Sequence, residues 1–221
     1  EVAWQDLTRA EPGTVRFTVH SGLYTSRDYS VEGDWSNASY LLAAGALKTS
    51  GIRVTGLDPD SAQGDRAILD ILRLMGARVD AFANEIAAYP GELRGADLDM
   101  GACPDLVPTV AVLACLARGE TRVRNAAHLR IKESDRLGDL AGELEKTGAR
   151  IELHEDGATI RPPSEVTEGP LRFDPHGDHR LAMALSLFGL AGVSHSLSDP
   201  DCVAKSFPGF WETWSLVKQN D

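Results

Sequence analysis

The sequence has little cysteine, few aromatic residues and no long apolar run. It has three cysteines among 221 residues, aromatic residues make up 6% of it, and no apolar stretch approaches the roughly 20 residues that a membrane helix needs. Cys103, Cys115 and Cys202 form no C-x-x-C pair. We therefore expect no metal site, no disulfide framework and, by default, a reducing cytoplasm. Cys115 lies in an apolar helical run, so we assign it to the core.

Positive charge is also scarce. Lys and Arg number 22 against 33 Asp and Glu, which gives a formal net charge of -11. An extended basic surface is what nucleic acids need, so we expect no nucleic-acid partner. The first residues, EVAWQDLTRAEPG, show no basic segment followed by an apolar core, so we expect no secretory signal there. The hydrophobic content of 43% is typical of a globular protein, and the length allows one large domain or two small ones.

What the sequence does contain is an internal repeat with a period of about 70 residues. Asp34, Asp105 and Asp178 each precede an apolar helical stretch rich in small residues, and they are 71 and 73 residues apart. Each stretch ends near a glycine, as helix C-termini prefer, and a short strand-like run follows. Such helices, apolar on several faces, are expected at the centre of a domain.

A second helix follows each of these strands. Two of these helices end in the similar runs MGARV and TGARI, and their apolar residues recur at helical spacing (Ile68, Ile71, Leu72 and Met75; Leu137, Leu140 and Leu144). Strand pairs follow both, and the second pair contains the hairpin signal Asp156-Gly157. The third helix, FPGFWETWSLVKQ, is not followed by closing strands. The closing strands of this third unit would come from residues 1–27 or from a segment outside this chain. Within residues 1–27, TVRFTV at 14–19 alternates like a strand. We predict three α/β units around a shared core.

The segment HLRIKESDRL, residues 128–137, places six ionisable side chains in ten positions. If it is helical, Lys132 and Arg136 share one face, and a helix N-terminus capped by Ser134 or Asp135 is a ready anion site. A capped surface helix with solvated charges explains the same pattern, and the segment alone slightly favours it.

Three further places combine charge with a helix start or a turn. In GDHRLAM, Asp178 would cap the helix and leave His179 and Arg180 in the first turn, where a cation is unfavourable unless an anion binds or a carboxylate such as Asp178 pairs with it. In DPDCVAKSFPGFW, Lys205 is either a site residue or an ordinary loop lysine. Asp105 is either a site residue or only an N-cap. The aromatic residues Phe210, Trp211 and Trp214 are expected in the core rather than as a stacking platform.

From about residue 28 to the C-terminus the sequence resembles the 5-enolpyruvylshikimate-3-phosphate synthase family. Four stretches carry this resemblance: VEGDWSNASYLLAAGAL, HLRIKESDRL, GDHRLAMALSL and DPDCVAKSFPGFW. The resemblance implies an α/β (α+β) fold in which a domain consists of three βαβαββ units with buried central helices, an inside-out α/β barrel. It also implies that residues 28–221 are the C-terminal half of the enzyme, and that residues 1–27 are a tail of the other domain with the crossover between them.

The resemblance implies transfer of the enolpyruvyl group of phosphoenolpyruvate to the 5-hydroxyl of shikimate-3-phosphate, in aromatic amino acid biosynthesis, without metal or organic cofactor. Asp105 then matches the carboxylate facing the 5-hydroxyl, and Glu133 the proton-transfer group near phosphoenolpyruvate. His179 lies beside the leaving group. Which carboxylate performs which proton transfer is left open by the sequence.

The same resemblance assigns the binding residues. Arg136 and Arg180 match the pair that binds the phosphoenolpyruvate carboxylate, a task suited to planar guanidinium groups. Lys205 matches a phosphate contact, and Lys132 a contact to shikimate-3-phosphate, beside the catalytic pair. His128 stands where some members have Asn, and either side chain can donate to a substrate oxygen. Glyphosate is expected to compete with phosphoenolpyruvate, and no membrane partner is expected.

Other binding residues of the family should lie upstream of residue 1. We therefore expect this chain to be an incomplete half that folds but turns over poorly or not at all without the N-terminal half. Two alternatives stay open at this point. One is an enolpyruvyl transferase acting on UDP-N-acetylglucosamine, and the other is a non-catalytic domain that binds an anion.

Overall fold

The computed structural model describes residue 18 and residues 20–83, 85–167 and 169–219. The chain divides into two units between Val31 and Glu32, and the second unit holds the helices and strands described below. The described residues before Glu32 form neither helix nor strand, and most of the TVRFTV run lies outside the described residues. The assignment of residues 1–27 to another domain stays a prediction. Among the described residues, no helix is both long and apolar enough to cross a membrane.

The α-helices are α2 (Trp35–Leu47), α3 (Ile68–Leu74), α4 (Val107–Cys115), α5 (Arg136–Glu145), α6 (His179–Leu185) and α7 (Phe210–Gln219). Short 3-10 turns connect or extend them: η1 (Gly64–Ala67), η2 (Pro104–Leu106), η3 (Ala127–Ile131), η4 (Ser186–Ala191) and η5 (Pro200–Lys205). The strands are β1 (Ile52–Thr55), β2 (Arg78–Phe82), β3 (Glu85–Tyr89), β4 (Asp97–Asp99), β5 (Thr121–Arg124), β6 (Arg150–His154), β7 (Gly157–Arg161), β8 (Leu171–Phe173) and β9 (His195–Leu197).

Three sheets follow one another along the chain, and the second shows the full pattern. Its order is β4-β5-β7-β6, with β4 parallel to β5 and with β7 antiparallel to both β5 and β6. The first sheet, β1-β3-β2, lacks a strand equivalent to β4 among the described residues. The third sheet contains only the parallel pair β8-β9, so among the described residues it lacks equivalents of β6 and β7. The predicted repeat is confirmed, including the incomplete third unit.

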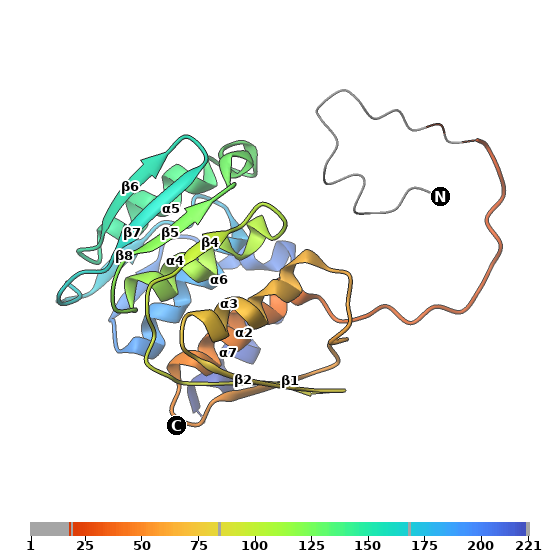
Figure 1. Cartoon of the computed structure of the whole chain (residues 1–221), viewed down its shortest axis with the longest axis horizontal. Coiled ribbons are helices and arrows are strands. Elements are labelled where there is room, and N and C mark those ends of the chain that lie inside the picture. Colours follow the sequence, from red (N-terminus) through yellow and green to blue (C-terminus); the bar gives the residue numbers. More distant parts are fainter. Residues whose placement is uncertain (1–17, 19, 84, 168, 220–221) are drawn as a thin grey trace. The chain divides into compact units, whose positions relative to one another are not determined.

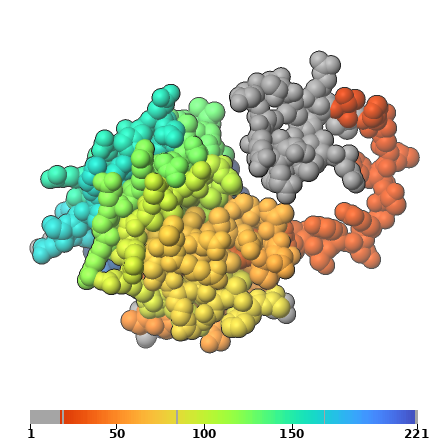
Figure 2. All heavy atoms as spheres, viewed as in Figure 1, coloured from red at the N-terminus to blue at the C-terminus, as the bar shows by residue number. Residues whose placement is uncertain are grey.

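The first helix of each unit lies at the centre, as the small-residue composition predicted. Every residue of α4 is buried, and α4 packs against both α2 and α6, while each sheet lies outside them (Figure 1). Gly45 of α2 shows why small residues are needed, because a Cβ there would lie 2.6 Å from the carbonyl oxygen of Ala88. In Figure 2 the first of the three α/β repeats, coloured orange to yellow, and the second repeat, green to cyan, form adjoining surfaces.

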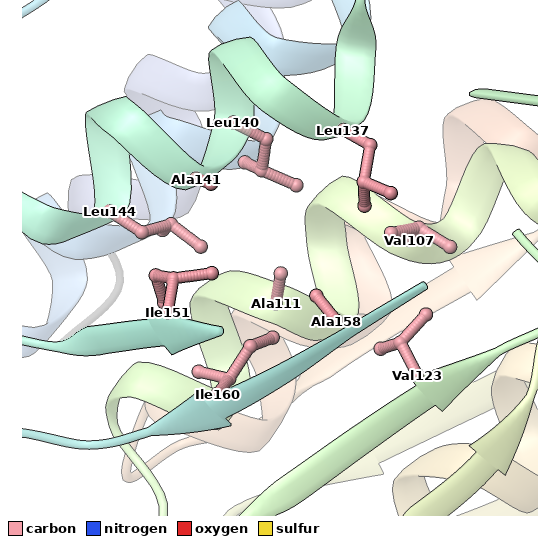
Figure 3. A pocket seen from close by; sticks show the side chains of 10 residues that line it. All are labelled: Val107, Ala111, Val123, Leu137, Leu140, Ala141, Leu144, Ile151, Ala158 and Ile160. Atoms are coloured by element: carbon pink, nitrogen blue, oxygen red, sulfur yellow. The ribbon is translucent and has the colours of Figure 1, made fainter. Parts of the chain in front are cut away.

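The second helices cover the outside of this core. Leu137, Leu140 and Leu144 of α5 are buried and face Ile151 and Ile160 of the second sheet, around a small cavity of about 10 Å³ (Figure 3). The apolar positions predicted for α3 (Ile68, Ile71, Leu72 and Met75) are buried in the same way. The amphipathic patterns therefore identified the correct faces of both helices.

The last helix, α7, contributes aromatic side chains to the core. Phe210 and Trp214 are buried and their rings stack at 5.2 Å between centroids, as predicted. Trp211 is only partly buried, and its indole nitrogen donates a hydrogen bond to the carbonyl oxygen of Pro200 at 2.8 Å. Cys115 is buried in α4, as expected, and none of the three cysteines is in a disulfide.

The hairpin predicted from Asp156-Gly157 is present between β6 and β7, but its turn is one residue earlier. His154 pairs with Gly157, so the two turn residues are Glu155 and Asp156, and Gly157 begins β7. Gly157 is required for another reason. A Cβ at this position would overlap the carbonyl oxygen of Val123 in the neighbouring strand β5.

Replacing Gly157 with alanine is therefore expected to destabilise the domain by about 1–3 kcal/mol, because β5 and β7 must separate to admit the methyl group. Gly142 provides a matched control, since it lies in α5 with no atom within 4 Å of an added Cβ. There alanine should stabilise by about 0.4–1 kcal/mol. Urea unfolding of both variants measures the difference, and equal stabilities would contradict the packing argument.

Candidate active site

The segment HLRIKESDRL does not form one continuous helix. Residues Ala127–Ile131 form the turn η3, and α5 begins only at Arg136, with Asp135 as its N-cap accepting a hydrogen bond from the backbone N–H of Gly138 at 3.0 Å. Of the two predicted caps, Asp135 is the one used. The prediction that Lys132 and Arg136 share a helix face is wrong, because Lys132 lies before the cap with φ -85° and ψ -144°. Its side chain is exposed, and His128 in η3 is half-buried.

Arg136 lies at the centre of the site and is 1% exposed. Its Nε donates to Asp178 at 2.7 Å, its Nη1 to Asp105 at 2.9 Å and its Nη2 to Glu133 at 2.7 Å. The three carboxylates come from the start of α6, from η2 and from the loop before α5. The guanidinium group of Arg136 therefore binds Asp105, which is 31 positions away in the sequence, and Asp178, which is 42 positions away. A buried charge is tolerated when it is paired and hydrogen-bonded in this way.

Arg180 shares one of these carboxylates. Its Nη2 lies 2.9 Å from Oδ2 of Asp105, while Oδ1 of Asp105 accepts from Arg136, so Asp105 bridges the two arginines. The cap prediction for Asp178 is confirmed, because Oδ1 of Asp178 accepts from the backbone N–H of Arg180 at 2.8 Å. The pairing of Arg180 with a carboxylate was also foreseen, although the partner is Asp105 rather than Asp178. The Nη1 atom of Arg180 is buried and has no hydrogen-bond partner among the described residues.

The interpretation of Asp105 as only an N-cap is wrong. Neither η2 nor α4 has a side-chain hydrogen bond at its N-cap. The chain enters α4 through the η2 turn with Pro104 at its first position, which places Asp105 inside the turn. Its carboxylate is thereby available to the two arginines. The repeat-related Asp34 is a true cap, accepting from the backbone N–H groups of Ser36 and Asn37.

Glu133 lies between two cations. Its Oε1 accepts from Lys205 Nζ at 2.6 Å and its Oε2 from Arg136. The hydrogen bond from Lys205, aided by the charge of Arg136, lowers the pKa of Glu133 from 4.5 to about 2 against the opposing effect of partial burial. Lys205 is thus joined to the segment before α5 rather than being a free loop lysine. Glu133 is ionised at neutral pH.

Replacing Lys205 with methionine should raise the pKa of Glu133 toward 4.5, because the largest lowering contribution is removed. A ¹³C NMR titration of the Glu133 carboxyl carbon measures this. Since the folded pKa is below the ordinary value, the ion pair stabilises the fold above pH 4.5, and that contribution is lost as the pH falls toward 2. A Glu133 pKa that stays near 2 in the variant would show that Lys205 is not the cause.

His179 is 4% exposed and follows the cap residue of α6. Burial, together with the neighbouring charge of Arg180, lowers its pKa below 6.5. His179 is therefore predominantly neutral at pH 7. Its Nδ1 atom has no hydrogen-bond partner among the described residues.

Sequence reasoning missed some of the residues around these arginines. Asp178 was identified as a cap and as a candidate partner of Arg180, yet it is fully buried and pairs with Arg136. Tyr40 of α2 is also fully buried, and burial raises the pKa of its hydroxyl despite the nearby charge of Arg180. Asp65 accepts a hydrogen bond from Ser36, and burial raises its pKa. One available signal was the repeated Asp-Arg pair, which occurs at the start of both second helices (65–66 and 135–136).

Comparison with known proteins identifies the family of this chain. A family model described as EPSP synthase (3-phosphoshikimate 1-carboxyvinyltransferase) matches residues 9–214. The 3-phosphoshikimate 1-carboxyvinyltransferase of Methanoculleus marisnigri is 47% identical over 205 residues, covering 90% of this chain and 47% of that protein. The enzyme of the same name from Mannheimia succiniciproducens is 43% identical, covering 86% and 43%.

Solved structures give the same result for the fold. An EPSP synthase from Acinetobacter baumannii superposes with a TM-score of 0.68 at 26% identity, covering 85% of this chain and 46% of that one. The enolpyruvyl transferase NikO from Streptomyces tendae gives 0.66 at 25% identity, covering 86% and 44%. The fold is thus that of enolpyruvyl transferases, as predicted. The chain belongs to the EPSP synthase family, and it spans about half the length of the relatives it matches.

Proposed function

We propose that this chain supplies one half of an active site that transfers the enolpyruvyl group of phosphoenolpyruvate to the 5-hydroxyl of shikimate-3-phosphate. Membership of the EPSP synthase family supports the reaction. The observation on which the proposal chiefly rests is the side-chain cluster around Arg136, named the site cluster below: Asp105, Glu133, Arg136, Asp178, Arg180 and Lys205. It combines cations for anionic substrates with carboxylates for proton transfer.

Arg136 and Arg180 are proposed to bind the phosphoenolpyruvate carboxylate. A guanidinium group has five N–H donors, and the three hydrogen bonds of Arg136 leave two unused. Nη1 of Arg180 is buried near the hydroxyl of Tyr40, and Arg136 is 1% exposed. The side chains that cover these N–H groups would therefore have to move for a carboxylate to reach them, while the ion pairs to the three carboxylates keep both arginines in place.

Glu133 and Asp105 are proposed to perform the two proton transfers as a pair. The hydrogen bond from Lys205 holds Glu133 ionised. A substrate phosphate that binds Lys205 would weaken this hydrogen bond, so the pKa of Glu133 would rise toward the range in which a carboxyl group exchanges protons. Asp105, held by two arginines, would face the 5-hydroxyl.

The remaining roles follow from the same assignment. Neutral His179 would donate a hydrogen bond to the leaving phosphate, and Lys132 and His128 would contact shikimate-3-phosphate. Fixed cations supply the charge stabilisation, so the proposal includes no metal or cofactor. The proposed partner is the N-terminal half of the enzyme. Glyphosate is the proposed competitor of phosphoenolpyruvate, and the cytoplasm is the proposed location.

An NMR titration with phosphoenolpyruvate tests the site. We expect shifts at residues 132–136 and 178–180 that require, or become much larger with, an N-terminal half from a close relative. Asp80 and Arg78 form an exposed ion pair on β2 and should not shift. The absence of shifts with and without the added half would contradict the proposal and favour a non-catalytic domain. Phosphate release with shikimate-3-phosphate or with UDP-N-acetylglucosamine as acceptor distinguishes the two transferase activities.

A further inference from the structure

A buried carboxylate outside the site cluster connects α5 to the turn that precedes α6. Glu143 is 4% exposed, and its Oε2 accepts from the backbone N–H of Asp174 at 2.8 Å and from Lys146 Nζ at 2.6 Å. Its Oε1 lies 3.3 Å from Nε2 of His176. Lys146 is a neighbour on the same helix, whereas Asp174 and His176 belong to the turn between β8 and α6.

That turn has an unusual backbone. His176 and Gly177 both have positive φ, 53° and 68°, and a left-handed conformation is unfavourable for a residue with a side chain. Such a conformation persists when surrounding contacts fix it. The contacts here are the two to Glu143, a hydrogen bond from the backbone N–H of His176 to Asp174 at 2.8 Å, and His176 Nδ1 at 3.9 Å from Asp139 of α5.

The turn leads directly into the site. The backbone N–H of Asp178 donates to the carbonyl oxygen of Pro175 at 2.8 Å, and the side chain of Asp178 accepts from Arg136. Arg136 and Glu143 are seven residues apart on α5, which places them two turns apart on the same helix face. One face of α5 thus contacts residues 174–178 at two points, Glu143 at the turn and Arg136 at the cap.

We propose that Glu143 is a positioning residue, which fixes the 174–177 turn and so holds Asp178 in place against Arg136. A shift of this turn would lengthen the Arg136–Asp178 hydrogen bond and move the first turn of α6, where Arg180 lies. The consequence of such a shift for phosphoenolpyruvate binding rests on the proposed function.

Hydrogen exchange of the Arg136 Nε–H group in the ¹⁵N-labelled chain tests the proposal directly, because this proton lies in the hydrogen bond to Asp178. Glu143→Ala should accelerate its exchange about tenfold, since local opening becomes easier when the turn is released. Glu143→Gln should stay within about twofold of the wild type, because an amide oxygen can still accept from Asp174. Glu145→Ala makes the same change as Glu143→Ala at an exposed carboxylate of α5 and should also stay within about twofold.

His176→Asn supplies a second variant in case Glu143→Ala does not fold. Asparagine tolerates positive φ but loses the imidazole contact, so exchange should accelerate by about threefold. Unchanged exchange in His176→Asn or in folded Glu143→Ala would overturn the proposal, as would equal acceleration in Glu145→Ala. In the assembled enzyme, Glu143→Ala should raise KM for phosphoenolpyruvate and Glu143→Gln should restore it. Accelerated exchange with an unchanged KM would support the positioning role and contradict the proposed function.

Discussion

Replacing Asp178 with alanine is expected to lower the free energy of unfolding by about 3–5 kcal/mol, the largest stability effect that the site predicts. Asp178 and Arg136 are both buried, with their charged atoms 2.7 Å apart. Removing the carboxylate leaves Arg136 one partner short in the interior, and it also removes the cap that accepts from Arg180. Urea unfolding of the wild type and the variant measures the loss.

Two further variants show whether the loss of stability comes from the burial of the ion pair or from the ion pair itself. Asp80→Ala breaks a surface ion pair with Arg78 at 2.6 Å, and its stability should be almost unchanged because water screens the exposed pair. The double variant Arg136→Met/Asp178→Leu replaces the buried pair with apolar side chains and should recover much of the lost stability, although not the binding site. An Asp178→Ala domain as stable as Asp80→Ala would contradict the account.

Replacing Glu133 with glutamine is expected to reduce kcat of the assembled enzyme by about 10²–10⁴-fold, the usual contribution of a positioned acid–base group. Glutamine is nearly isosteric, and its amide oxygen can still accept from Lys205 or Arg136, but it cannot transfer the proton. KM should therefore change less than kcat. Steady-state phosphate release, with both substrates varied, distinguishes the two effects.

The neighbouring Asp135 supplies the matched control. Asp135→Asn makes the same chemical change two residues away, and asparagine caps helices as well as aspartate does. Asp135 contacts Arg130 at 3.5 Å and none of the cations of the site cluster. Its kcat should stay within a few-fold of the wild type. Equal losses in the Glu133 and Asp135 variants would show that Glu133 acts only through the local charge.

The fold was largely predictable because its determinants are local. The helical spacing of Leu137, Leu140 and Leu144 gave the buried face of α5, and the repeated Asp before a small-residue helix identified the central helices. The cap predicted at Asp178 was correct for the same reason. The Asp156-Gly157 turn was displaced by one residue because the glycine is required by a neighbouring strand, which local turn rules do not include.

Some of the predicted site residues lie together in the structure, but the sequence did not indicate how their side chains are connected. Lys132 and Arg136 seemed to share a face only if α5 began early, and the Asp135 cap prevents this. That Arg136 is buried among three carboxylates depends on α6 and η2, which packing brings to it from distant parts of the chain. Glu143 gave no sequence signal, because its main partners are a backbone N–H and a histidine more than 30 residues away.

The most direct test of the central claim is phosphate release from phosphoenolpyruvate and shikimate-3-phosphate, measured for this chain alone and after addition of a purified N-terminal half from a relative such as the Methanoculleus marisnigri enzyme. The chain spans about half of that protein, so we expect further substrate contacts to come from the other half. The account predicts no measurable release by either half and shikimate-3-phosphate-dependent release by the mixture, abolished by Glu133→Gln in this chain. Release by this chain alone, or undiminished release by the mixture containing Glu133→Gln, would contradict it.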